Sequence, residues 1–185
     1  ATYRTAFQSG QIDEYQTVDA DDARAVAQGA EAEALEVELL SYSATMFMNV
    51  KVAPWTDPRV RRAVNRAMNR QVYIDILQKG SGRPAGPINP RFVDYSLSQD
   101  ELAKLQPFDV KEAKGLFEAA GVTEFDFQPS ASIPDHLNIF VSQMNAAGVK
   151  VNATPLPNWG TEGHASRLHS GLSPTPEYAT PDTAL

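Results

Sequence analysis

The residues with the clearest chemical potential are the arginines of one short segment, residues 53–70 (APWTDPRVRRAVNRAMNR). Five arginines follow Asp57 in this segment, and no acid follows it. A guanidinium group presents a rigid fork of N–H donors that fits carboxylates and phosphates. The segment therefore predicts either a recognition helix for nucleic acid or a surface helix whose arginines pair with acids elsewhere in the chain.

The charge of the whole chain favours the second interpretation. The 185 residues contain 23 acids against 16 lysines and arginines, which gives a formal net charge of −7. Nucleic-acid-binding domains are usually basic, and an acidic balance also disfavours anionic membrane surfaces as partners. No apolar stretch approaches the length needed to cross a membrane. We therefore expect the arginines to pair with the protein's own acids, and we expect no nucleic-acid partner.

Residue types suited to catalysis or metal binding are sparse. The chain has no cysteine, which excludes disulfides, thiolate metal sites and cysteine nucleophiles. It contains no Gly-x-Ser-x-Gly elbow and no phosphate-binding loop. Glu162, His164 and His169 could form a metal or hydrolase site, but two histidines five residues apart share a helix face poorly. The sequence thus gives no basis for an enzyme, a catalytic residue, a metal or a cofactor.

A helix is needed to present the arginine segment. Asp57 is suited to cap a helix that begins at Pro58, and the helix is expected to run to about residue 79 and to end at Gly80. One apolar stripe recurs at helical spacing: Val60, Ala63, Val64, Ala67 and Met68. Four arginines fall on the opposite, solvent-facing side: Arg59, Arg62, Arg66 and Arg70. Arg61 lies between the two sides, so we expect it to contribute more to stability than Arg66.

Helices and strands alternate along the rest of the chain. Strands are expected at residues 12–17, 34–42, 45–50, 124–129 and 149–154, and helices at residues 19–28, 109–120, 133–147 and 159–169. Residues 80–98 are rich in Gly and Pro and predict a long loop, and residues from 171 onward predict an irregular tail. Both ends are expected to be cut from something larger. The alternation predicts an α/β fold.

A series of short motifs lies in a recognisable order. The first motif has Asn49, then Pro54, Trp55 and Asp57, then Val60-Arg61-Arg62-Ala63 and Ala67-Met68-Asn69-Arg70. A Gly-Pro loop follows at residues 86–90, then a helix with Asp109, Ala113, Leu116, Ala120 and Gly121, and then Ala147-Gly148-Val149-Lys150-Val151 with Trp159 after it. In this order the motifs resemble the extracytoplasmic solute-binding proteins of ABC importers, family 5, which include oligopeptide- and dipeptide-binding proteins.

The resemblance implies a fold. It is one lobe of a two-lobed, periplasmic-binding-protein-like fold (type II, cluster C), with a mixed sheet and flanking helices. Residues 1–42 would be the tail of the first lobe up to a hinge near residues 42–44, and residues 43–185 an incomplete C-terminal ligand-binding lobe. The arginine helix would be a structural element, with Asn49, Asp57, Arg61 and Arg70 as motif residues. Asn69 stands where the family usually has Asp, which would remove one ion partner of Arg70 or Arg61.

The resemblance also implies a wall that faces the ligand. Trp159, Arg167 and His169 match a tryptophan and an Arg-His pair that face the ligand in peptide-binding members; the alternative is a core tryptophan with two surface bases. The chain lacks the Trp-x-x-Asp whose carboxylate holds a peptide amine in those members, and Glu177 or Asp182 would replace it. The solute stays open among peptides, sugars, opines and metal chelates.

The function implied is that of the substrate-binding component of an ABC transporter. Such a protein captures a peptide or other small solute outside the cytoplasm and delivers it to the permease subunits of the membrane complex. We expect a monomer without cofactor, in a periplasmic or extracytoplasmic membrane-associated location, with the signal segment absent from this chain. The alternative, from another class, is a nucleic-acid-binding or regulatory module that uses the arginine-rich helix 58–79.

Overall fold

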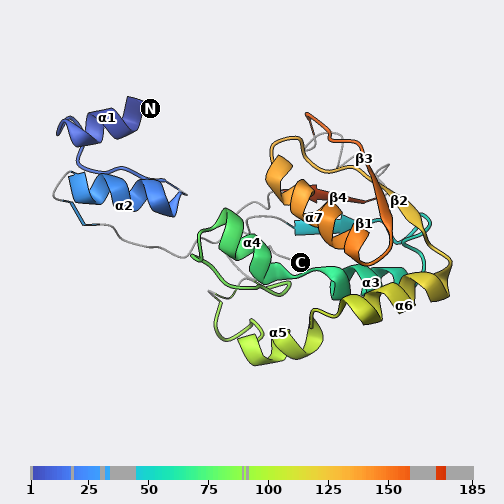
Figure 1. Ribbon diagram of the computed structural model, residues 1–185. Helices are drawn as coiled ribbons and strands as arrows, with labels where there is room; N and C mark the ends of the chain where they lie inside the picture. Colours follow the sequence, from blue (N-terminus) through green and yellow to red (C-terminus); the bar gives the residue numbers. More distant parts are fainter. Residues whose placement is uncertain are drawn as a thin grey trace.

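The computed structural model describes residues 2–17, 19–29, 32–33, 45–88, 90, 92–158 and 170–173. The helices are α1 (Thr2–Gln8), α2 (Ala20–Gly29), α3 (Pro58–Ala67), α4 (Arg70–Leu77), α5 (Gln99–Leu105), α6 (Val110–Ala120) and α7 (Pro134–Ala146). The strands are β1 (Thr45–Met48), β2 (Glu124–Phe127), β3 (Lys150–Ala153) and β4 (Ser170–Ser173). Helices and strands are interspersed along this length, with α3, α4, α5 and α6 following one another between β1 and β2 (Figure 1). The expected α/β class is confirmed.

The described strands form two pairs that meet at one point. β2 and β3 are parallel, with Phe125 opposite Val151, and α7 supplies the crossover that a parallel pair requires. β1 and β4 are antiparallel. The Gln128 N–H donates to the Ser170 carbonyl over 2.8 Å, and the Ser170 hydroxyl donates to the Asp126 carbonyl over 3.0 Å. β4 therefore lies beside the carboxyl end of β2 and joins the two pairs.

One hydrophobic core lies between these strands and the helices α3, α6 and α7. Its centre is aromatic: the rings of Phe127 and Phe140 stack with centroids 4.5 Å apart, and Trp55 meets Phe125 edge-on at 4.8 Å. Such pairs add about 0.5–1.5 kcal/mol each beyond the burial of their area. The predicted stripe of α3 faces this core, with four fully buried residues: Val60, Ala63, Val64 and Ala67.

The helix α3 lies side by side with α6 (Figure 1). Ala63 and Ala67 of α3 and Ala113 of α6 are fully buried in the common core, and such small side chains let two helix backbones approach closely. Asp109 caps α6 by accepting the Glu112 N–H over 2.8 Å, and its own N–H donates to the Arg66 carbonyl of α3. This link fixes the start of α6 to the last turn of α3.

The predicted helix over residues 58–79 is wrong, because it is two helices. Met68 is extended (φ −83°, ψ 107°) and ends α3. The Asn69 side chain then accepts the Gln71 N–H over 3.1 Å and caps α4. Asn side chains compete for backbone donors and favour caps over helix interiors. Asn69 therefore acts as a helix cap here, a role that the sequence analysis did not give it.

Other predictions also fail. Residues 12–17 were expected to form a strand, but no described strand pairs with them, and a strand needs a hydrogen-bonded neighbour. The predicted irregular tail begins with β4, because four residues of low strand propensity pair with β1. The helix α5 was not predicted, although Ser98 and Glu101 form a capping box that signals it. The strand expected at 34–42 and the helix expected at 159–169 lie outside the described residues.

The helices α1 and α2 pack against one another (Figure 1). Asp22 of α2 joins them, because its carboxylate pairs with Arg4 over 2.7 Å and accepts the Tyr15 hydroxyl over 2.5 Å. That hydrogen bond to Asp22 raises the pKa of Tyr15. The division of the chain at residue 42 stays a prediction, since residues 34–44 lie outside the described part.

The arginines of α3 do not all face solvent as predicted. Arg66 is only 12% exposed, and its guanidinium pairs with Glu112 of α6 over 2.8 Å and donates to the Leu105 carbonyl over 3.1 Å. Arg70, at the start of α4, is half-buried. Arg62 is 59% exposed and pairs with the other oxygen of Glu112 over 2.7 Å. The expected rank of Arg61 above Arg66 therefore loses its basis, because Arg66 is held at least as firmly.

We predict that Arg66→Ala lowers the free energy of unfolding more than Arg62→Ala. A partly buried hydrogen bond to a charged group contributes about 1.5–3 kcal/mol, whereas an exposed ion pair contributes about 0–1 kcal/mol. Both arginines share Glu112, and Arg66 differs from Arg62 in its burial and in its further hydrogen bond to the Leu105 carbonyl. Urea denaturation of both variants measures the difference. Equal losses would show that burial of Arg66 carries no extra stabilisation.

Candidate functional site

The motif residues Asn49 to Arg61 form a turn that closes one side of the core. The Asn49 side chain accepts the Lys51 N–H over 3.0 Å at the end of β1. Trp55 is fully buried, and the Arg61 guanidinium donates to its carbonyl over 2.6 Å. Arg61 also reaches the Thr56 carbonyl over 3.2 Å. The turn therefore holds a core tryptophan in place and ties it to α3.

Asp57 lies in the same turn and caps α3. Its carboxylate accepts the Arg59 N–H over 2.8 Å and pairs with the Arg59 guanidinium over 2.6 Å. These hydrogen bonds from Arg59 lower the pKa of Asp57. The charged cap is thus favoured both by the free N–H groups of the helix start and by an adjacent cation.

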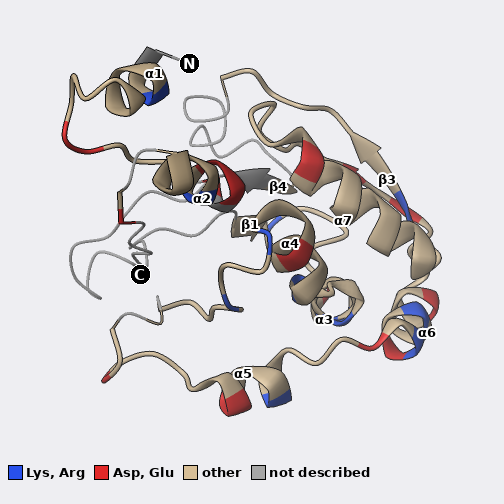
Figure 2. Ribbon diagram, turned by 60° about the vertical axis from the view of Figure 1, so that its left-hand side comes forward, with Lys and Arg blue, Asp and Glu red and all other residues tan. Residues whose placement is uncertain are grey.

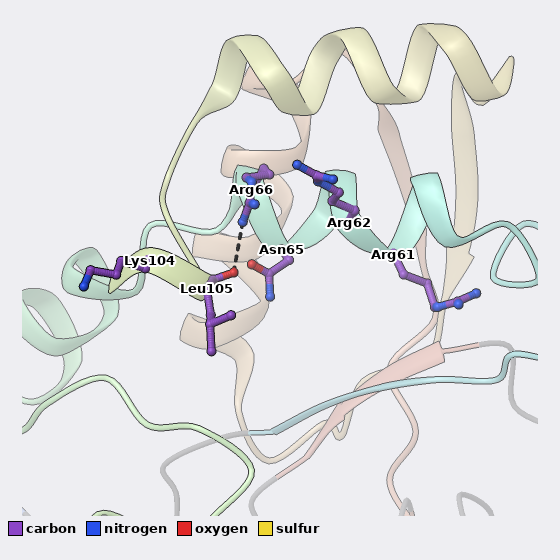
Figure 3. A pocket seen from close by; sticks show the side chains of 6 residues that line it. All are labelled: Arg61, Arg62, Asn65, Arg66, Lys104 and Leu105. Carbon is purple, nitrogen blue, oxygen red and sulfur yellow. Dashed lines mark hydrogen bonds between the residues drawn. The ribbon is translucent and has the colours of Figure 1, made fainter. Parts of the chain in front are cut away.

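A shallow, open basin of about 470 Å³ lies between α3 and α5 (Figure 3). It is lined by six residues: Arg61, Arg62, Asn65, Arg66, Lys104 and Leu105. In Figure 3 the side chains of Arg62 and Arg66 point toward α6, while Arg61 points away from them. We call this surface the arginine basin.

The arginine basin shows how the positive charge of residues 53–70 is used. Each of its three guanidinium groups is engaged within the protein, Arg61 by backbone carbonyls and Arg62 and Arg66 by Glu112. Figure 2 shows acidic and basic positions together on α6, not a surface of one sign. The concentration of positive charge in the sequence therefore serves mainly to join α3 to its neighbours.

The carboxyl end of β2 is the second candidate site. Beyond β2, the Leu156 N–H donates to the Pro129 carbonyl over 2.8 Å, and the Ala131 N–H donates to the Leu156 carbonyl over 3.0 Å. Ser170 is bound to the same end of β2 from the other side. Leu156 and Ser170, which flank residues 159–169 in the sequence, therefore both lie at this edge. In open α/β sheets, ligands bind outside the carboxyl ends of the strands.

The residues predicted to face the ligand belong to, or follow, that stretch of chain. Trp159, Arg167, His169 and Glu177 all lie outside the described residues, as do Glu162, His164 and Asp182. Their role stays a prediction. Among the residues that the structure describes, no group of three or more His, Asp and Glu side chains could hold a metal ion.

A cluster of polar side chains lies between α4 and α7, and the sequence analysis missed it. The rings of Tyr73 and His136 lie 6.0 Å apart, and the Gln143 amide donates to the Asn69 carbonyl over 3.1 Å. The Tyr73 hydroxyl, the His136 Nε2 and the Gln143 Oε1 are buried and have no hydrogen-bond partner. Burial raises the pKa of Tyr73 and lowers the pKa of His136. No motif signals the cluster, because it forms only where two helices meet.

Comparison with known proteins identifies the family. Residues 1–171 match the family "Bacterial extracellular solute-binding proteins, family 5 Middle". The chain belongs to this family. It is 31% identical over 130 residues to Di/tripeptide-binding protein 2 of Pseudomonas aeruginosa (strain UCBPP-PA14), an alignment that covers 69% of this chain and 22% of that protein. It is 30% identical over 116 residues to the glutathione-binding protein GsiB of Pectobacterium atrosepticum, covering 59% and 22%.

The fold is also similar to that of solved structures. The periplasmic binding protein DppA of Helicobacter pylori, in complex with the peptide STSA, superposes with a TM-score of 0.72 at 18% identity, covering 100% of this chain and 36% of that one. The predicted type II fold is thereby confirmed, and the share covered agrees with one lobe. The chain spans about a fifth of the length of these curated relatives.

The comparisons bear on the other predictions as well. The relatives are binding proteins and not enzymes. None of the comparisons supports the alternative of a nucleic-acid-binding module, and the arginines on which it rested are engaged within the protein. Among the described helices, none combines the length and the apolar character needed to cross a bilayer.

We predict that His136 makes the free energy of unfolding fall as the pH drops below about 6.5. Because burial lowers the pKa of His136 in the folded protein, the unfolded chain, with an ordinary pKa of about 6.5, takes up the proton first. Stability then falls as the pH drops below that value. In His136→Phe, which keeps a ring beside Tyr73, the loss of stability below this pH should be smaller than in the wild type. Thermal denaturation at a series of pH values measures both proteins, and identical slopes would contradict the prediction.

Proposed function

We propose that this chain supplies one wall of a solute-binding cleft and acts as the substrate-binding component of an ABC importer. The observation that carries the proposal is the family match over residues 1–171. The arrangement at the carboxyl end of β2 supports it, because Leu156 and Ser170 both lie at the edge outside which ligands bind in open α/β sheets. Such proteins work by closing two lobes around the solute.

The solute that we propose is peptide-like. The relatives are named for binding di- and tripeptides and glutathione, and DppA contains a bound peptide. These molecules share amide groups, an amine and a carboxylate. The predicted wall of Trp159, Arg167, His169 and Glu177 has the complementary chemistry: an aromatic face, two bases for a carboxylate and one acid for an amine. We keep these four residues as the proposed contacts.

The proposed partners follow from the same role. The loaded protein would deliver its solute to the permease subunits of the membrane complex, and it would act as a monomer outside the cytoplasm. It would carry out no chemical step and need no cofactor, because closure around the solute is sufficient for capture.

We predict that the isolated chain binds di- and tripeptides no more tightly than about 1 mM, which corresponds to roughly −4 kcal/mol. With one wall only, a bound peptide stays solvated on its other side, and few hydrogen bonds become buried. The measurement is tryptophan fluorescence during titration with peptides, and with sugars and metal chelates for comparison. The chain has two tryptophans, and Trp55 is fully buried in the core.

The matched control is Trp159→Phe, which leaves Trp55 as the remaining tryptophan. If Trp159 lies in the peptide wall, its fluorescence responds in the wild type and the response disappears in the variant. A response that persists in Trp159→Phe would remove Trp159 from the site. Micromolar peptide binding by the isolated chain would show that the site is complete, and the one-wall proposal would then be wrong.

A further inference from the structure

Arg70 is a cation in an unfavourable place. It is the first residue of α4, where the helix dipole is positive and repels a positive charge. Its side chain is half-buried, and its guanidinium makes one long hydrogen bond, 3.4 Å, to the Met68 carbonyl. Arg70 forms no ion pair with a described residue, in contrast to Arg59, Arg62 and Arg66. A partly buried charge without an ion pair costs free energy, and an anion beside Arg70 would offset that cost.

The groups around Arg70 are suited to such an anion. Burial lowers the pKa of Arg70, and the nearby Arg66 lowers it further, while Tyr73 acts in the opposite direction. Tyr73 lies three residues after Arg70 on α4, so the two side chains are neighbours on one face of the helix, and the buried Tyr73 hydroxyl has no partner. The ring of Tyr73 contacts His136, whose buried Nε2 also has no partner. We call the region formed by Arg70, Tyr73 and His136 the α4–α7 seam.

We propose that the α4–α7 seam binds one carboxylate group. The guanidinium of Arg70 can hold both carboxylate oxygens through parallel N–H bonds, and the Tyr73 hydroxyl can donate to one of the same oxygens. The bound group neutralises the cation at the helix start and satisfies a buried donor. The inference concerns this seam alone, so it does not depend on the proposed capture of a peptide.

The charge of the seam selects a carboxylate over a phosphate. Arg70 is the cation of the seam, and Arg66, a second cation that acts on Arg70, is already paired with Glu112. Tyr73 is neutral, since burial raises its pKa. The single positive charge of Arg70 therefore balances one carboxylate, whereas a phosphate dianion would bring a second negative charge without a cation to balance it.

The neighbouring residue Asn69 offers a direct way to test the charge. It caps α4 through its amide oxygen, and Asp is as good a cap as Asn. Asn69→Asp therefore keeps the cap and adds a carboxylate next to Arg70. If the seam requires one negative charge, this variant supplies it internally and competes with any added anion.

The experiment is a titration of the 185-residue chain with sodium acetate against sodium chloride at equal ionic strength. The readouts are the thermal midpoint and the ¹H–¹⁵N resonances of residues 69–73 and 136. We expect a saturable response to acetate in the wild type, at least tenfold weaker in Arg70→Gln and at least fivefold weaker in Asn69→Asp. Arg62→Gln, which removes an exposed cation of the arginine basin, should bind acetate as the wild type does. If Arg70→Gln does not fold, Arg70→Lys replaces it, because it keeps the charge but loses the two-pronged geometry.

The same experiment distinguishes the sources of the carboxylate. If a free carboxylate occupies the seam, acetate binds as described. If an acidic side chain of the protein occupies it, the wild type shows no response to acetate. The Arg70 Nε–H is then protected from hydrogen exchange, and Arg70→Gln lowers the thermal midpoint more than Arg62→Gln does. Both results support the proposal. An acetate response that survives in Arg70→Gln overturns it, as does a wild type with neither an acetate response nor a protected Arg70 Nε–H. The fluorescence of Trp159 tests peptide capture independently of this experiment.

Discussion

The packing of α3 against α6 is the interaction on which the rest of the lobe depends. Small, fully buried side chains of both helices permit close contact, and Glu112 of α6 bridges Arg62 and Arg66 of α3. The buried valines of α3, Val60 and Val64, belong to the same core as the aromatic side chains of β2 and α7. Because α3 is apolar toward the core and cationic toward α6 and α5, its rotation about its own axis is fixed. The turn with Trp55 and the start of α6 are then positioned from it.

The arginines of α3 are paired with groups of the protein and do not form a positively charged surface. An acidic chain contains a cationic segment because that segment lies where several backbone carbonyls and one acid of a neighbouring helix need donors. Arginine suits this task, since its fork binds carbonyls and carboxylates together and loses little on burial compared with lysine. Arg70 departs from the pattern, because it is partly buried without an acid among the described residues. This departure is the reason that we propose a carboxylate beside Arg70.

Much of the fold could be predicted from the sequence where the determinants are local. Asp57 and Pro58 mark the start of α3, and Asp109 and Gly121 bound α6, because capping depends on residues within one turn. The motif order was sufficient to predict the family. The prediction failed at Asn69, where a local cap overrode a continuous apolar stripe, and at β4, where the sequence Ser-Gly-Leu-Ser has no strand pattern of its own. The ligand wall was inferred only through resemblance, and those residues lie outside the described part.

The sequence by itself determined the helix boundaries with strong caps, the mixture of helices and strands, the buried face of α3 and the family. These features depend on residues that are close in the sequence or on the spacing of apolar residues, so they do not require contacts between distant segments. The tertiary structure alone decided which arginine is buried, that β4 pairs with β1, and that the rings of Tyr73 and His136 meet between α4 and α7. Burial and ion pairing depend on what lies opposite a residue across the fold. For Arg66 that is Glu112, 46 positions along the chain, and no local pattern specifies it.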